Sequence, residues 1–230
     1  MNKITGKQKT VSIFLKMIVF VSAVTGTALS AYAAKDRFMG GRTTFMFFTT
    51  QSNIAMALIS VIGICILCTA GKTGRVWSVI KFVGTISITL TGIVFGFVLA
   101  PALGVGAWNV QNTLTHLVVP VLSVVDFFVV GNVLDLKKKD VCYVLIPPVL
   151  YAVYAGIGYV LGWQFVEGYN YPYFFLNWGS PAGAFGFTKG LPFMGTGWWI
   201  LALLIFLLAV AHCYLAVNDR IHGKSRRSVS

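Results

Sequence analysis

Six long apolar runs are the feature that most constrains how this 230-residue chain can fold. Each run is close to the ~20 residues that an α-helix needs to cross a ~30 Å hydrocarbon core. Backbone polar groups in lipid must be paired within the protein, and the runs are too continuous for the alternating strands of a barrel. The sequence therefore predicts an all-α polytopic membrane protein whose six transmembrane helices form one bundle. The runs cover residues 11–34, 45–68, 78–103, 111–134, 141–163 and 195–217.

Basic residues are divided unequally between the two sides of this predicted bundle. With the N-terminus placed inside, fourteen of the eighteen Lys and Arg residues fall on the inner side. Positively charged loops stay cytoplasmic, which predicts an N-in/C-in, multi-pass protein of the plasma membrane. We expect a six-helix domain over 11–217 between cytoplasmic basic tails at 1–10 and 218–230. The inner set is Lys3, Lys7, Lys9, Lys16, Lys72, Arg75, Lys81, Lys137, Lys138, Lys139, Arg220, Lys224, Arg226 and Arg227, and the outer set is Lys35, Arg37, Arg42 and Lys189.

Composition excludes an ordinary soluble domain, because 57% of the residues are hydrophobic and only 10% are charged. The net charge of +12 would suit nucleic acid. The basic residues, however, lie in short loops and tails beside the spans, which is typical of topology determinants and of attraction to anionic lipid. We therefore expect membrane lipids as partners and no nucleic acid. The sequence does not define an oligomeric state.

The N-terminal run has a second interpretation. Ala31, Tyr32 and Ala33 resemble the small-residue cleavage site of a secretory signal. The apolar stretch over 17–34 is longer than a typical signal core and can span a bilayer by itself, so we interpret it as the first span. Cleavage after Ala33 is the alternative, and it would leave five spans with unchanged sidedness.

Polar side chains inside the spans mark a candidate site, because burying them in a bilayer is costly. The second and fourth spans both run from outside to inside, so Thr49 and His116 are expected on the order of 6–8 Å below their helix starts, in one layer. A hydroxyl that meets an imidazole is the minimal arrangement for nucleophilic catalysis. The polar residues concerned are Thr49, Thr50, Gln51, Ser52 and Asn53 in the second span, with Asn112 and His116 in the fourth.

Purely structural interpretations of the same residues stay open. An intramembrane His often serves only as an interhelical hydrogen-bond donor, and Thr or Ser often bonds its own backbone. Asp126 lies ten residues beyond His116, or ~15 Å along the helix axis, too far for a hydrogen bond between them. We expect Asp126 to be neutral or paired in the inner half of the bundle. Because His, Cys and carboxylate groups do not gather at one depth, neither a metal nor another cofactor is predicted.

The long outer segment over 164–194 is rich in aromatic residues, Pro and Gly. Trp and Tyr favour the membrane interface, so the segment is either an aromatic belt or a lid over an outward-facing pocket. Asn177 lies within it.

Three motifs in order resemble one known family. They are residues 47–53 (Phe-Phe-Thr-Thr-Gln-Ser-Asn), residues 116–120 (His-Leu-Val-Val-Pro) followed by Asp126, and residues 171–177 (Tyr-Pro-Tyr-Phe-Phe-Leu-Asn). Together with six spans over about 11–217, they resemble the androgen-induced and androgen-dependent type of integral membrane protein, which includes bacterial relatives.

The resemblance implies a threonine hydrolase that cleaves fatty-acid esters of hydroxy fatty acids. Its His falls on His116, and its Thr falls on Thr49, which we favour, or on the adjacent Thr50. We expect a lipid-ester hydrolase acting on a lipid ester or another amphiphile. The alternatives are a non-catalytic membrane protein that binds or transports a lipid or small amphiphile, and a non-enzymatic membrane partner or assembly factor. Supporting or substrate-binding roles, such as hydrogen bonds to the oxyanion, are expected for Ser52, Asn53, Asn112 and Asn177.

Overall fold

The computed structural model describes residues 4–33, 40–69 and 73–223. In this part of the chain, six helices are long and apolar enough to cross a membrane, and no extended sheet is present. The prediction of an all-α, multi-pass membrane protein is confirmed. The spans are Gly6–Tyr32, Phe48–Thr69, Arg75–Leu103, Val110–Val129, Lys138–Val160 and Thr196–His222.

Three of these spans are composites of different helix types. The third and fourth each contain a π-helical turn, and the fifth begins as a 3-10 helix. Short 3-10 turns lie outside the spans. The elements are α1 (Gly6–Tyr32), η1 (Gly41–Met46), α2 (Phe48–Thr69), α3 (Arg75–Val94), η2 (Phe95–Leu99), α4 (Ala100–Leu103), α5 (Val110–Thr113), η3 (Leu114–Val118), α6 (Val119–Val129), η4 (Gly131–Val133), η5 (Lys138–Leu145), α7 (Ile146–Val160), η6 (Phe174–Leu176) and α8 (Thr196–His222).

The terminal helices extend into segments that were predicted to be tails. Thr5 caps α1 by accepting a hydrogen bond from the Gln8 backbone N–H at 3.2 Å, and Gln8 Oε1 accepts one from the Thr5 backbone N–H at 3.1 Å. This capping box starts the helix at residue 6 instead of 11. At the other end, α8 continues until Gly223 adopts a left-handed conformation at φ 62°. The fourth span is shorter than predicted and ends at residue 129.

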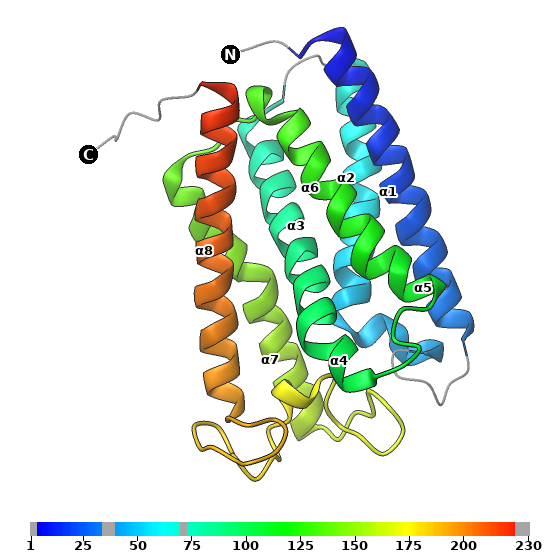
Figure 1. The fold of residues 1–230 in the computed structure, drawn as a ribbon, viewed down its shortest axis with the longest axis vertical. Coiled ribbons are helices and arrows are strands. Elements are labelled where there is room, and N and C mark those ends of the chain that lie inside the picture. The colour runs from blue at the N-terminus through cyan, green and yellow to red at the C-terminus, as the bar shows by residue number, and fades with distance from the viewer. Residues whose placement is uncertain (1–3, 34–39, 70–72, 224–230) are drawn as a thin grey trace.

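The start of α1 and the end of α8 lie at the same end of the bundle, which we call the termini end (Figure 1). The aromatic segment between α7 and α8 lies at the opposite end. Helix α3 is central, because it packs against α2, α6, α8 and η5, whereas α1 covers α2 and α6. The third span is accordingly the most buried one, at 61% of its apolar window, against 17% for α8.

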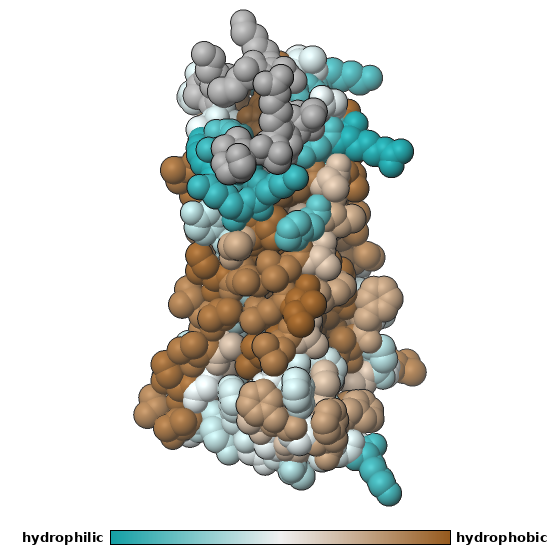
Figure 2. Space-filling model, turned by 90° about the vertical axis from the view of Figure 1, so that its left-hand side faces the viewer, coloured by the Kyte–Doolittle hydropathy of each residue, from teal (hydrophilic) through white to brown (hydrophobic). Residues whose placement is uncertain are grey.

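The outer surface has the polarity expected of a protein in lipid. Figure 2 shows a hydrophobic band across the middle of one face of the molecule, with hydrophilic residues gathered at the termini end. Large apolar side chains of the spans, such as Phe14, Leu58 and Ile205, are exposed. In a bilayer they lie against acyl chains, so their exposure carries no penalty.

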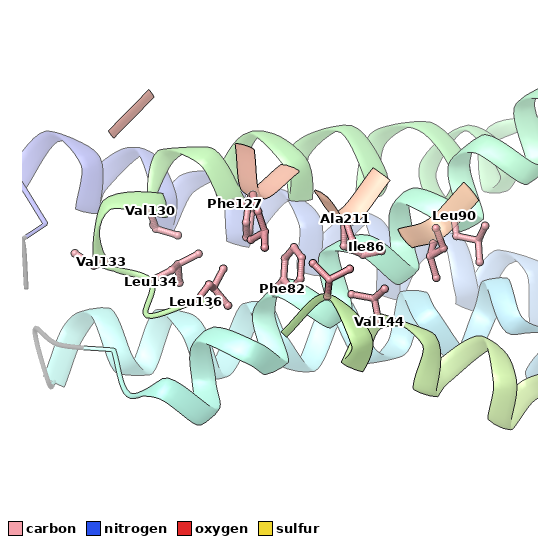
Figure 3. Packing of buried hydrophobic residues seen from close by; sticks show 13 residues of the cluster. Phe82, Ile86, Leu90, Phe127, Val130, Val133, Leu134, Leu136, Val144 and Ala211 are labelled. Atoms are coloured by element: carbon pink, nitrogen blue, oxygen red, sulfur yellow. The ribbon is translucent and has the colours of Figure 1, made fainter. Parts of the chain in front are cut away.

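The largest apolar cluster fills the half of the bundle near the termini end (Figure 3). Phe82 of α3 packs against Phe127 of α6 with 5.8 Å between the ring centroids. Val144 of η5 and Ala211 of α8 complete the contact around Ile86. Because this cluster fixes α3 against α6, it also sets how the polar residues farther along these two helices face each other.

Candidate functional site

Thr49 is buried at the start of α2 and faces a tyrosine from the distant aromatic segment. Its backbone N and its Oγ1 each lie 3.4 Å from the Tyr173 hydroxyl oxygen. The first N–H groups of a helix lack carbonyl partners within it. The Tyr173 oxygen therefore accepts from the Thr49 N–H, and in the second contact either hydroxyl can donate to the other.

Tyr173 is a functional candidate that sequence reasoning did not select. Its side chain is buried, and burial raises the pKa of its phenol above the ordinary value of 10. The group therefore stays protonated and able to donate a hydrogen bond at neutral pH. The signal that pointed to it was the motif at 171–177, which was assigned to a family resemblance without a role for this residue.

Thr49 and Tyr173 line a cavity of about 70 Å³. The remaining walls are almost wholly apolar and come from α3, α7 and α8, with Thr91 as a further hydroxyl. Phe175 and Leu176 of the aromatic segment also line the cavity. The segment therefore forms part of the cavity wall, and its role as a lid stays a prediction.

A larger groove of about 610 Å³ lies beside this cavity, between α2, α3 and the fifth span. The two spaces share the side chains of Phe48 and Tyr151, whose rings meet edge to face at 5.3 Å. Exposed residues such as Ile146 and Leu150 form part of the groove wall, so it faces the lipid. Its size falls within the range of known ligand sites.

His116 is buried on the π-helical turn η3 of the fourth span. Its Nδ1 lies 3.0 Å from the Asn112 carbonyl oxygen and 3.0 Å from Thr115 Oγ1. A carbonyl oxygen only accepts, so Nδ1 carries the ring proton. The other nitrogen, Nε2, is buried and has no hydrogen-bond partner among the described residues. The imidazole is thus held in the tautomer that a general base requires.

A second π-helical turn faces the histidine. Phe95, the first residue of η2, stacks on the His116 ring with 3.7 Å between centroids and 26° between planes. One turn earlier on α3, a Cβ at Gly92 would lie 3.0 Å from the His116 carbonyl oxygen and from Pro120. Glycine is therefore what allows the third span to approach this closely. Single π-helical turns occur frequently at functional sites.

No hydrogen bond joins Thr49 and His116. Among the described residues, the side-chain partner of Thr49 is Tyr173, and His116 does not line the cavity. The predicted hydrogen bond is therefore absent. The two helices are nevertheless joined at this level, because the Asn53 amide donates to the Thr49 carbonyl at 2.9 Å and to the Thr115 carbonyl at 3.2 Å. This bridge agrees with the prediction that both residues lie in one layer.

The structure places the other polar residues of α2 differently from the prediction. Thr50 faces Thr44, with 3.4 Å between the two hydroxyl oxygens, and does not line the cavity. Ser52 donates to the Thr49 carbonyl at 2.9 Å, so its contact with Thr91 Oγ1 at 2.8 Å is one in which Thr91 donates. An amide has only two N–H groups, and both of those on Asn53 are engaged by carbonyls. Neither Ser52 nor Asn53 has a donor left for an oxyanion.

The two remaining asparagines of the predicted site form hydrogen bonds with backbone groups and stabilise local backbone structure. Asn112 donates from its amide to the Ala107 carbonyl at 2.7 Å, while its own carbonyl orients His116. Asn177 accepts from the Gly179 N–H at 3.0 Å and, through its carbonyl, from Thr196 Oγ1 at 3.1 Å. It therefore ties the aromatic segment to the start of α8. Neither residue lines the cavity.

Asp126 is paired, as expected, in the half of the bundle near the termini end. It forms ion pairs with Lys16 and Lys81 and no hydrogen bond with His116. Across the described ranges, no three His, Cys, Asp or Glu side chains are grouped closely enough to hold a metal ion.

Comparisons with known proteins give no assignment. Neither the protein-family models, nor the characterised proteins, nor the solved structures contain a match to this chain. The family resemblance therefore rests on the three sequence motifs alone.

Proposed function

We propose that this protein is a membrane lipid-ester hydrolase with Thr49 as nucleophile and His116 as general base, related to the family that its motifs resemble. One observation carries the proposal: the Thr49 hydroxyl lines a covered apolar cavity, at a helix N-terminus and next to a tyrosine O–H. A helix N-terminus favours negative charge, so this position suits an alcohol that attacks a carbonyl. Thr49 is preferred over Thr50 because only Thr49 lines the cavity.

The chemistry proceeds through an acyl-enzyme. Thr49 Oγ1 attacks the ester carbonyl carbon while its proton passes to His116 Nε2. The Tyr173 O–H and the Thr49 N–H donate to the oxyanion, in place of the Ser52 and Asn53 side chains expected from sequence. When the tetrahedral intermediate collapses, the alcohol of the ester leaves and takes the proton from His116. Water then gives a proton to His116, attacks the acyl group and releases the acid, and Thr49 recovers its proton.

This mechanism requires His116 to move relative to the unliganded structure. The Phe95 ring covers one face of the imidazole, so this ring and the histidine side chain shift together when substrate enters. Catalytic hydrogen bonds are often long or unformed without substrate. The neighbouring lipid-facing groove gives an acyl chain a route to the cavity from within the bilayer.

The absence of a hydrogen bond between Thr49 and His116 favours a second candidate, a non-catalytic protein that binds or carries an amphiphile in the same cavity and groove. The two candidates differ in one respect that can be measured. A hydrolase turns over its ligand, whereas a binding protein releases it unchanged.

The experiment is turnover of a panel of lipid esters by the purified protein in detergent. We expect release of free acid by the wild type and a loss of about 10²–10⁴-fold in His116→Ala. His212→Ala is the matched control, because His212 also bonds a backbone carbonyl through Nδ1, at 2.8 Å, but is exposed on α8. Ester binding without acid release by any variant would instead support the binding protein.

We also propose the N-in/C-in orientation in a plasma membrane, which is supported by the charge asymmetry and by the start of α1 and the end of α8 lying at the same end of the bundle. Green fluorescent protein fused after Ser230 is expected to fluoresce, because it folds in the cytoplasm. Alkaline phosphatase fused at the same point is expected to be inactive. A non-fluorescent green fluorescent protein fusion together with an active alkaline phosphatase fusion would show that the C-terminus lies outside.

A further inference from the structure

A buried ionic cluster lies far from Thr49, between three spans. The Lys16 ammonium of α1 is 2.7 Å from both carboxylate oxygens of Asp126 on α6, and the Lys81 ammonium of α3 donates to Oδ2 of the same group. Ser12 donates to Oδ1 at 2.5 Å. All three ionic side chains are at most 4% exposed. The sequence analysis counted both lysines on the inner side and did not predict that they are buried and paired with Asp126.

The charges of this cluster do not balance. When both lysines are protonated, two ammonium groups share one carboxylate, which leaves one positive charge in the interior. Among the described residues, Asp126 is the one carboxylate that forms an ion pair with either lysine, and Asp135 and Asp140 pair with Arg75. An uncompensated buried charge is destabilising by several kcal/mol. A bound anion would remove this penalty.

The hydrogen bonds show which of the two lysines has N–H donors without an acceptor among the residues that the structure describes. An ammonium has three N–H donors. Lys16 makes three contacts, to Ser12 and to both oxygens of Asp126, whereas Lys81 makes one within the described part of the chain. Two donors of Lys81 are therefore uncommitted at a site that excludes bulk water.

A small cavity adjoins these donors. Lys16 and Lys81 both line it, together with Trp77 of α3 and Gly63 of α2. A Cβ at Gly63 would lie 2.6 Å from Lys16 Cε, so glycine at this position leaves the room in which the lysine reaches inward. The cavity is about 10 Å³, which is roughly the room needed by one water molecule. A single small ion is of this size, and a lipid phosphate group is not.

We propose that this cavity binds one small monovalent inorganic anion of the halide class, with the Lys81 ammonium as its principal donor. The anion brings the two lysines and Asp126 to zero net charge and joins α1, α2, α3 and α6 at one point. The site is separate from the proposed hydrolase and does not depend on it.

The test compares thermal unfolding of the purified protein in sodium chloride and in sodium gluconate at equal ionic strength. Chloride is expected to raise the unfolding midpoint of the wild type saturably, by about 5–10 °C at a concentration one hundred times the Kd. Lys81→Met is expected to lose this shift while still folding, because it leaves a balanced Lys16–Asp126 pair. Lys138→Met, which alters an exposed lysine outside the cluster, is the matched control and is expected to keep the shift.

Trp77 provides a second, local readout. Bromide is expected to quench part of the tryptophan fluorescence saturably, and this part is expected to disappear in Trp77→Phe and in Lys81→Met. Equal unfolding midpoints in the two salts, together with no saturable quenching, would overturn the proposal. The charge of the cluster would then be relieved by a bound water molecule or by a neutral lysine. A chloride shift that persists in Lys81→Met would also overturn it, because the anion would then bind elsewhere.

Discussion

Replacing Thr49 with alanine is expected to reduce ester hydrolysis by about 10³-fold or more, because the variant lacks the alcohol that forms the acyl-enzyme. Thr49→Ser keeps an alcohol at the same position and is expected to retain part of the activity. Acid release from the best ester of the panel, measured as kcat, checks both variants. Labelling by a fluorophosphonate probe, which reacts with activated hydroxyls, is expected to follow the same order.

Thr50→Ala is the matched control for this experiment. Thr50 is a neighbouring buried threonine on the same helix, but it faces Thr44 and not the cavity. We expect the Thr50→Ala variant to hydrolyse esters at close to the wild-type rate. Loss of activity in Thr50→Ala, with activity kept in Thr49→Ala, would identify Thr50 as the nucleophile instead of Thr49. Full activity in both alanine variants would remove the threonine mechanism altogether.

The fold was accessible from the sequence because span length and polarity are one-dimensional properties. The bilayer sets a length of ~20 residues, and each apolar run met it. The errors lie at the helix ends, where local hydrogen bonds decide the outcome. Neither the capping box at Thr5 and Gln8 nor the left-handed Gly223 is visible in a hydropathy pattern.

The depth of the candidate site was accessible for the same reason, whereas the direction of its side chains was not. Depth follows from the rise per residue, and the Asn53 bridge agrees with the equal depth predicted for Thr49 and His116. Direction depends on the rotation of each helix about its own axis. The π-helical turns at η2 and η3 change that rotation, so regular helical periodicity does not show that Phe95 covers the histidine.

The burial of two lysines was not predicted, because it depends on tertiary partners. A lysine near the end of a span normally extends towards the interface, and on that basis Lys16 and Lys81 were counted simply as inner-side charges. The sequence shows Asp126 on another span but does not show that all three residues face one interior point. The Asp126 carboxylate, 2.7 Å from the Lys16 ammonium, stabilises the lysine in the interior more than the membrane interface would. The two groups come this close only in the folded bundle.

Asp126→Asn is expected to destabilise the protein by about 3–5 kcal/mol, because it leaves two buried ammonium groups without a counter-charge. Unfolding in a denaturing detergent, followed by circular dichroism, measures the loss. Asp135→Asn is the matched control. Asp135 is half exposed and lies 4.0 Å from Arg75, so its replacement is expected to cost about 0–1 kcal/mol.

A second background separates charge from packing. When Lys16 and Lys81 are both replaced by methionine, the carboxylate of Asp126 becomes the unpaired group, so Asp126→Asn is expected to have little effect or to stabilise the protein. A pure packing role for Asp126 predicts the same loss in both backgrounds. That result would contradict the ionic account of this cluster and, with it, the positive charge that the proposed anion neutralises.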